Sequence, residues 1–210
     1  GYDTKKEENH WKIRQQVGMV FQNPDNQIVA AIVEEDVAFG LENIGVPSAE
    51  IAPRVKAALA VVGMSAYSHQ APHRLSGGQK QKIAIAGILA LEPSCIIFDE
   101  PTAMLDPVGR QEIVKTVVRL NKEKHITIVY ITHRMEEAIL ADRTVVMHAG
   151  KIAFQGSPQE VFTQVDKLKQ LGLEVPLAAE VARELSPFAP KLSSHIITHE
   201  ELVEALCPLK

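Results

Sequence analysis

The stretch CIIFDEPTAMLD, residues 95–106, decides the fold of this chain. Residues 95–98 form a short, continuous apolar run, which is typical of a parallel strand that is buried on both faces. Two acidic residues, Asp99 and Glu100, follow this run directly. Because α/β sheets bind ligands beyond the carboxyl ends of their parallel strands, we expect both carboxylates at a ligand-binding edge.

These acidic residues suit phosphate chemistry. Asp99 could hold Mg²⁺ beside nucleotide phosphates, directly or through water, and Glu100 could orient an attacking water or accept its proton. A strand end followed by a polar turn explains an isolated Asp-Glu pair equally well. Asp106 has a simple structural explanation too, since an aspartate before Pro107 is a good helix N-cap.

Two more apolar runs, 17–21 and 126–131, end in polar residues that would lie at the same edge of the sheet. Gln22 follows the first run, and its amide could contact Mg²⁺ and water. His133 follows the second, and its imidazole could donate to a phosphoryl group and steady Glu100. A structural role is the simpler explanation of either residue alone. Helical segments alternate with the strands, which predicts an α/β fold with a mostly parallel sheet.

The segment LSGGQ, residues 75–79, supports two interpretations. Ser76 and Gln79 have the spacing of a capping box, which would begin the helix that follows. A capping box does not need Gly77 and Gly78, which lower helix stability. Two glycines at a helix start do let a phosphate approach free backbone N–H groups at the positive end of the helix. Both interpretations can hold together.

Hydrophobic periodicity and turn signals divide the chain. We expect a first domain at 1–156, with a helical subdomain inserted at about 27–90, and a small helical appendage at 157–210. Within the first domain, residues 144–154 predict a β-hairpin.

Composition excludes several classes of protein. A net charge of −4 gives no general attraction for nucleic acid. No apolar stretch approaches the roughly 18 residues that span a bilayer. The two cysteines, Cys95 and Cys207, form no disulfide framework or metal-binding spacing, which fits a reducing compartment.

The order and spacing of these pieces resemble the ATP-binding-cassette ATPases, over about residues 17–156. The resemblance implies a P-loop NTPase-type fold that uses ATP and Mg²⁺. The resemblance also implies that LSGGQ is the signature sequence of this family, which binds the nucleotide held by a second cassette. The other matches are the Q-loop residue Gln22, the Walker B residue Asp99, the catalytic Glu100, the D-loop residue Asp106 and the switch residue His133.

One expected element has no counterpart in the 210 residues. The phosphate loop reads G-x-x-x-x-G-K-[S/T], and the nearest approach is residues 40–45, which Val46 and Pro47 follow. We therefore expect this loop and the first strands of the sheet upstream of Gly1. On that interpretation the 210-residue piece is incomplete and does not hydrolyse ATP alone.

Residues 17–43, 75–90 and 171–185 are similar to the energy-coupling factor transporters, importers of vitamins and of cobalt or nickel. That resemblance implies three partners: a second cassette, identical or different, a transmembrane coupling subunit and a substrate-binding membrane subunit. It places the chain on the cytoplasmic face of the cell membrane as a peripheral protein. Residues 23–29 would receive the coupling subunit, and 157–210 would serve dimerisation. Pro101 departs from the usual sequence of this family.

Two alternatives remain open at this point. One is a soluble cassette ATPase that acts on DNA or ribosomes, although the chain has no coiled-coil insertion, tandem cassette or basic arm. The other is a non-enzymatic assembly or regulatory module that uses the C-terminal appendage.

Overall fold

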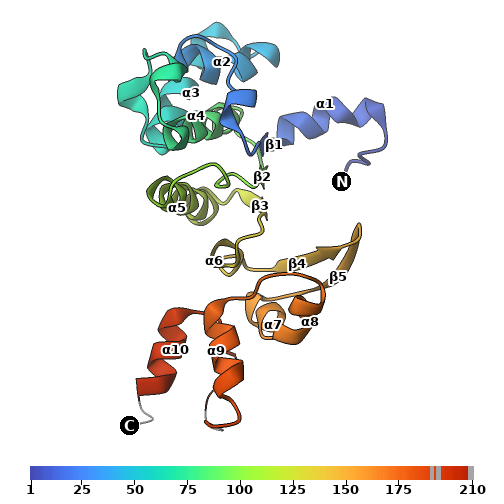
Figure 1. Cartoon of the computed structure of the whole chain (residues 1–210). Coiled ribbons are helices and arrows are strands. Elements are labelled where there is room, and N and C mark those ends of the chain that lie inside the picture. The colour runs from blue at the N-terminus through green and yellow to red at the C-terminus, as the bar shows by residue number, and fades with distance from the viewer. Residues whose placement is uncertain (190–191, 193–194, 208–210) are drawn as a thin grey trace. The chain divides into compact units, whose positions relative to one another are not determined.

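The computed structural model describes residues 1–189, 192 and 195–207. The chain divides into two compact units, Gly1–Ile131 and Thr132–Lys210, and each is described by itself (Figure 1).

The first unit is built on a three-stranded sheet. Its strands are β1 (Val17–Val20), β2 (Cys95–Asp99) and β3 (Thr127–Ile131), in the order β1-β2-β3. Both pairings are parallel, with Val20 opposite Phe98 and Asp99 opposite Ile131. The predicted α/β fold with a parallel sheet is confirmed.

The two faces of this sheet differ in exposure. Val20, Ile96 and Phe98 are fully buried, whereas Val129 and Ile131 are each 46% exposed. Burial on both faces, which was predicted for residues 95–98, is not found: Ile96 and Phe98 are buried, but Cys95 and Ile97 are only half-buried. The buried face packs on helices α4 and α5 of the same unit.

Most of the remaining first unit is helical. The α-helices are α1 (Glu7–Gln16), α2 (Val33–Asn43), α3 (Ser48–Val61), α4 (Gly77–Ala90) and α5 (Pro107–Lys124). Short 3-10 helices are η1 (Pro24–Asn26), η2 (Ser65–Tyr67) and η3 (Pro72–Arg74). Helix α4 packs against α2, α3, α5 and β1, so it lies at the centre of this unit. The predicted helical character of residues 27–90 is confirmed.

Local sequence explains where the two long helices begin and end. Ser76 caps α4 in the predicted capping box with Gln79, and Asp106 caps α5 before Pro107. Helix α5 ends at Lys124, and its C-cap His125 adopts a left-handed backbone with φ 54°. In β2, burial raises the pKa of the Cys95 thiol, so this residue acts as a small apolar side chain.

The second unit contains a hairpin and short helices. Strands β4 (Thr144–His148) and β5 (Lys151–Gly156) pair antiparallel around Ala149 and Gly150, both with positive φ. The helices are α6 (Met135–Ala138), α7 (Pro158–Phe162), α8 (Val165–Gln170), α9 (Leu177–Leu185) and α10 (His199–Leu206). Capping boxes at Ser157 and Thr198 begin α7 and α10.

The division between the units differs from the boundary expected after residue 156. Val146 of β4 and Phe154 of β5 share a hydrophobic cluster with Val161 and Phe162 of α7. The hairpin therefore packs with the helices that follow it, and it belongs to the second unit. The sequence could not show this, because burial of the hairpin depends on contacts with a later segment.

None of the helices in the described residues combines the length and the apolar character that crossing a bilayer requires.

Candidate active site

The ends of β1 and β2 bring Gln22 and Glu100 together. The Gln22 side chain amide donates to Glu100 Oε2 at 3.3 Å, although 78 residues separate them. Gln22 follows β1 by two residues and Glu100 follows β2 directly. The parallel pairing of β1 and β2 therefore produces the contact that the sequence predicted only as a shared sheet edge.

The backbone of Glu100 has an unusual conformation. Its φ is 45°, in the left-handed region that side chains other than glycine rarely adopt. The Glu100 N–H donates to the Ile131 carbonyl at 3.0 Å, and the Ala103 N–H donates to the Glu100 carbonyl at 3.1 Å. These bonds to β3 and to the following turn hold the chain where it leaves the sheet.

Asp99 is the last residue of β2 and is half-buried beside Glu100. No cluster of three or more histidine, cysteine or acidic side chains suited to a metal ion occurs within the described ranges. Mg²⁺ does not need such a cluster, because it is commonly bound by one or two carboxylates together with phosphate oxygens and water. Asp99 and the Gln22 amide oxygen fit that donor set.

The start of α4 carries the signature residues. The Ser76 N–H donates to Gln79 Oε1 at 2.9 Å, and the Gln79 N–H donates to Ser76 Oγ at 3.3 Å. Ser76 and Gly77 are exposed, and the first N–H groups of a helix have no partner within it. The capping interpretation is confirmed, and it leaves backbone donors available to an outside group.

Packing within the chain does not explain the two glycines. A Cβ on Gly77 would lie 3.5 Å from Leu105 Cδ2, and a Cβ on Gly78 would lie 3.5 Å from Gly109 Cα. Both are ordinary van der Waals distances, and neither glycine has a positive φ. An alanine would fit at either position, so packing among the described residues does not require glycine there.

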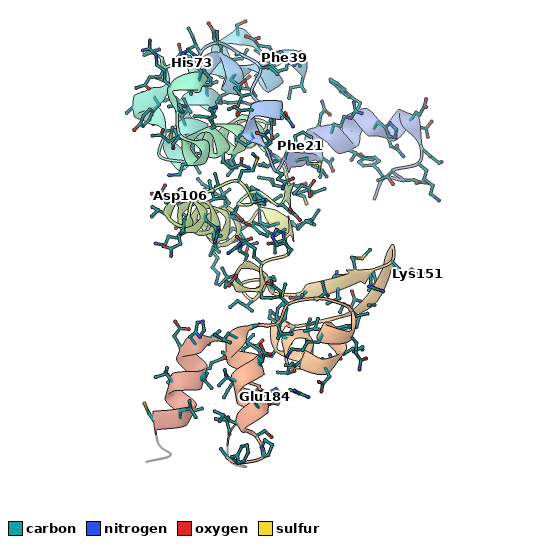
Figure 2. The ribbon with its side chains drawn as sticks, in the orientation of Figure 1. Phe21, Phe39, His73, Asp106, Lys151 and Glu184 are labelled. Carbon is teal, nitrogen blue, oxygen red and sulfur yellow. The ribbon has the colours of Figure 1, made fainter. Side chains whose placement is uncertain are left out.

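Asp106, labelled in Figure 2, acts as the N-cap of α5, as its structural explanation predicted. Its Oδ1 accepts from the Gly109 N–H at 3.2 Å. Gly109 Cα is also the atom that a Cβ on Gly78 would approach, at 3.5 Å. The D-loop and the signature therefore lie side by side in one chain, while a contact of Asp106 across a dimer interface stays a prediction.

His133 belongs to the second unit, so its position relative to Glu100 stays a prediction. The residues around it are held locally. Thr132 Oγ1 donates to Glu137 Oε2 at 2.7 Å and accepts from the Arg134 N–H at 3.0 Å. Glu137 lies on α6 and is buried. This carboxylate fixes the turn that carries His133, and the sequence analysis did not single it out.

Comparison with known proteins identifies the family. The sequence profile described as "ABC transporter" matches residues 1–103. An energy-coupling factor transporter ATP-binding protein, EcfA1, from Clostridium novyi is 60% identical over 210 residues. The alignment covers 100% of this chain and 75% of that protein. The chain belongs to the energy-coupling factor transporter ATP-binding proteins. The EcfA1 protein of Symbiobacterium thermophilum is 57% identical over 209 residues and 73% of its length is covered.

Solved structures of ABC proteins share the fold. CbiO1 from Clostridium perfringens, described as part of the ABC transporter complex cbiONQ, superposes with a TM-score of 0.72. It is 39% identical, over 88% of this chain and 68% of that one. The cassette MJ0796, a dimer in a post-hydrolysis state bound to ADP and Pi, gives a TM-score of 0.63. It is 28% identical, over 73% of this chain and 68% of that one. Both the cassette fold and the assignment as a transporter ATP-binding subunit are thus confirmed.

Proposed function

We propose that this energy-coupling factor ATP-binding subunit hydrolyses ATP through Glu100, Gln22 and His133. The observation that carries the proposal is the 3.3 Å contact between the Gln22 amide and the Glu100 carboxylate at the carboxyl edge of the parallel sheet. In that place Glu100 accepts a proton from the attacking water, and Gln22 fixes the orientation of the carboxylate. His133 donates to the terminal phosphoryl group.

Mg²⁺ is the metal that this donor set fits, with Asp99 and Gln22 as its protein ligands. When bound, the ion offsets the negative charge of the phosphates. Ser76, Gly77, Gly78 and Gln79 bind the nucleotide of a neighbouring cassette, and Gly77 and Gly78 supply the free N–H groups at the start of α4, since those of Ser76 and Gln79 are used by the capping box. The support is that neither glycine is needed for packing within the chain.

The partners follow from the family. We propose a second cassette, a transmembrane coupling subunit and a substrate-binding membrane subunit, with the chain on the cytoplasmic face of the cell membrane as a peripheral protein. Vitamins or transition-metal ions are the substrate class. The support is the transporter name of the relatives and the description of CbiO1 as part of a transporter complex. The net charge of −4 agrees with the absence of a nucleic acid partner.

Two surfaces are assigned to these partners. Residues 23–29 receive the coupling subunit, and Val29 in this segment is 63% exposed. Residues 157–210 contribute to contact between cassettes. Exposed apolar side chains on their helices support this role, with Leu177 of α9 61% exposed and Val203 of α10 59% exposed.

The test is the ATPase rate of the complete cassette, by which we mean these residues joined to a phosphate loop, assembled with its partner cassette. Glu100→Gln should lower kcat by about 10²- to 10⁴-fold, the usual contribution of a general base. Glu112→Gln is the matched control, because Glu112 is an exposed residue of α5 whose ion pair is with Lys82. If the Glu100→Gln variant turned over ATP at an unchanged rate, Glu100 would not be the general base.

A further inference from the structure

The turn after β1, residues 21–27, is attached to helix α4 through the backbone of Phe21. The Gln81 side chain amide of α4 donates to the Phe21 carbonyl at 3.1 Å. The Phe21 N–H donates to Gln27 Oε1 at 3.1 Å. Phe21, labelled in Figure 2, immediately precedes Gln22, so both polar groups of its peptide backbone are held by glutamine side chains.

Two further contacts join the same turn to α4. Lys80 Nζ lies 2.7 Å from Asp25 Oδ1, and the Gln27 amide donates to the Ala84 carbonyl at 3.5 Å. Lys80, Gln81 and Ala84 lie within one and a half turns of the helix that begins with the signature. The turn and the signature helix are therefore connected at three points.

Gln81 is the least expected of these residues. It is 0% exposed, in a helix that is otherwise largely apolar on its buried side. Because the Phe21 carbonyl can only accept, the NH₂ group of Gln81 must face it. Its Oε1 is buried and has no hydrogen-bond partner among the described residues. A buried, half-satisfied amide destabilises the fold relative to an apolar side chain of the same size, so its presence calls for a role other than packing.

The contacts form a continuous series. Helix α4 holds Phe21 through Gln81, Phe21 is bonded covalently to Gln22, and Gln22 contacts Glu100. We propose that Gln81 is a positioning residue, which places Gln22 against Glu100 and makes that contact depend on where the signature helix lies. The inference rests on the proposed hydrolytic role of Glu100. It adds that a shift of α4 changes the rate of the chemical step in the same chain.

Gln81→Met tests the proposal, because methionine has nearly the same volume and no donor. The ATPase of the complete cassette should lose about 10- to 100-fold in kcat, the effect expected when a catalytic group is displaced by about 1 Å. KM for ATP should change much less than kcat, since Gln81 itself touches no phosphate-binding group. Lys82→Met is the matched control on the same helix, because Lys82 pairs with Glu112 and not with the turn. Its kcat should equal that of the unmodified cassette.

A double-mutant cycle separates positioning from a general effect on stability. If Gln81 acts through Gln22, then Gln81→Met should cause little further loss in a Gln22→Ala background. The same fold-loss in both backgrounds would overturn the proposal. Hydrogen exchange gives a readout without turnover: Gln81→Met should speed exchange in residues 21–27 and leave β3 unchanged.

The outcomes distinguish this inference from the proposed function. If Glu100→Gln abolishes turnover while Gln81→Met leaves kcat unchanged, the positioning role is wrong and the hydrolytic role stands. If Glu100→Gln has no effect, both are wrong. Should Gln81→Met fail to fold, Asp25→Ala removes the contact with Lys80, the exposed part of the same attachment. The Asp25 substitution should lower kcat less than Gln81→Met does, and it should have no further effect in a Gln22→Ala background. An equal loss of kcat in both backgrounds would contradict the proposal.

Discussion

Gly18 of β1 lies directly against Ile88 of α4. A Cβ on Gly18 would lie 2.1 Å from Ile88 Cγ2, a separation at which one of the two residues must move. Glycine is therefore required at this position by the close approach of the strand and the helix. The contact lies beside the turn that carries Gln22, so it also fixes how near the signature helix comes to β1.

Gly18→Ala should destabilise the complete cassette by about 1–3 kcal/mol, the usual effect of overpacking a core. Chemical denaturation measures the change in the free energy of unfolding. Ile88→Ala removes Cγ2 and should reduce the additional loss caused by Gly18→Ala, whereas strictly additive losses would contradict the steric explanation. Gly87→Ala is the control in the same helix. A Cβ there has no neighbour within 4 Å, and the change should stabilise by about 0.5–1 kcal/mol.

Gly78→Asp should block ATP-driven association of the cassette without lowering its stability. A carboxylate in the first turn of α4 would repel the phosphate of a neighbouring site. The same charge near a helix N-terminus stabilises the helix by about 0.3–1 kcal/mol. Light scattering with and without ATP, in a Glu100→Gln background, measures association, and thermal unfolding measures stability. Intact ATP-driven association would show that the start of α4 is only a helix cap and binds no phosphate.

Substitutions at Asp106 separate its role as the N-cap of α5 from its predicted contact with a second cassette. Asp106→Ala removes the N-cap of α5 and should cost about 1 kcal/mol of unfolding free energy. Asp106→Asn keeps a capping oxygen for the Gly109 N–H and should leave stability nearly unchanged. If Asp106 also contacts a second cassette through its charge, Asp106→Asn should lower ATPase activity alone. Full activity in a stable Asp106→Asn variant would leave only the capping role.

The cap of α10 should weaken in acid. The Ile197 N–H bonds to Glu201, and this bond, with those from Thr198, holds the pKa of that carboxyl below its ordinary value of 4.5. The stabilisation is thus fully present above the ordinary value and is lost as pH falls through the lowered one. Glu201→Gln has no such titration. The difference in stability between the two proteins, followed by denaturation from pH 7 to 3, should shrink below about pH 4.5; a constant difference would count against the linkage.

Local patterns predicted much of the fold. The strands around residues 95 and 127, the caps at Ser76 and Asp106, and the hairpin all depend on neighbours within a few residues. The meeting of Gln22 and Glu100 was predicted only as a shared edge, because their distance depends on strand order and register. His133 was predicted for the same edge, and that arrangement stays a prediction.

Other features depend on distant parts of the chain and were missed. The exposure of Val129 and Ile131 depends on which helices cover the sheet. The role of Gln81 depends on Phe21, which is 60 residues away in sequence. Gln81 lies in the helix that the capping box at Ser76 predicted, and nothing in its local sequence indicated a partner 60 residues away.

The left-handed backbone of Glu100 lowers the stability of the fold at the residue that is proposed to act in ATP hydrolysis. Holding a residue with a side chain in this conformation costs about 1–2 kcal/mol relative to a relaxed one, and glycine avoids the penalty. Glu100→Gly should therefore raise the melting temperature while it removes the carboxylate. If Glu100 is the general base proposed above, a laboratory selection for heat resistance alone would favour inactive cassettes at this position, so such a selection needs ATPase activity as a second criterion.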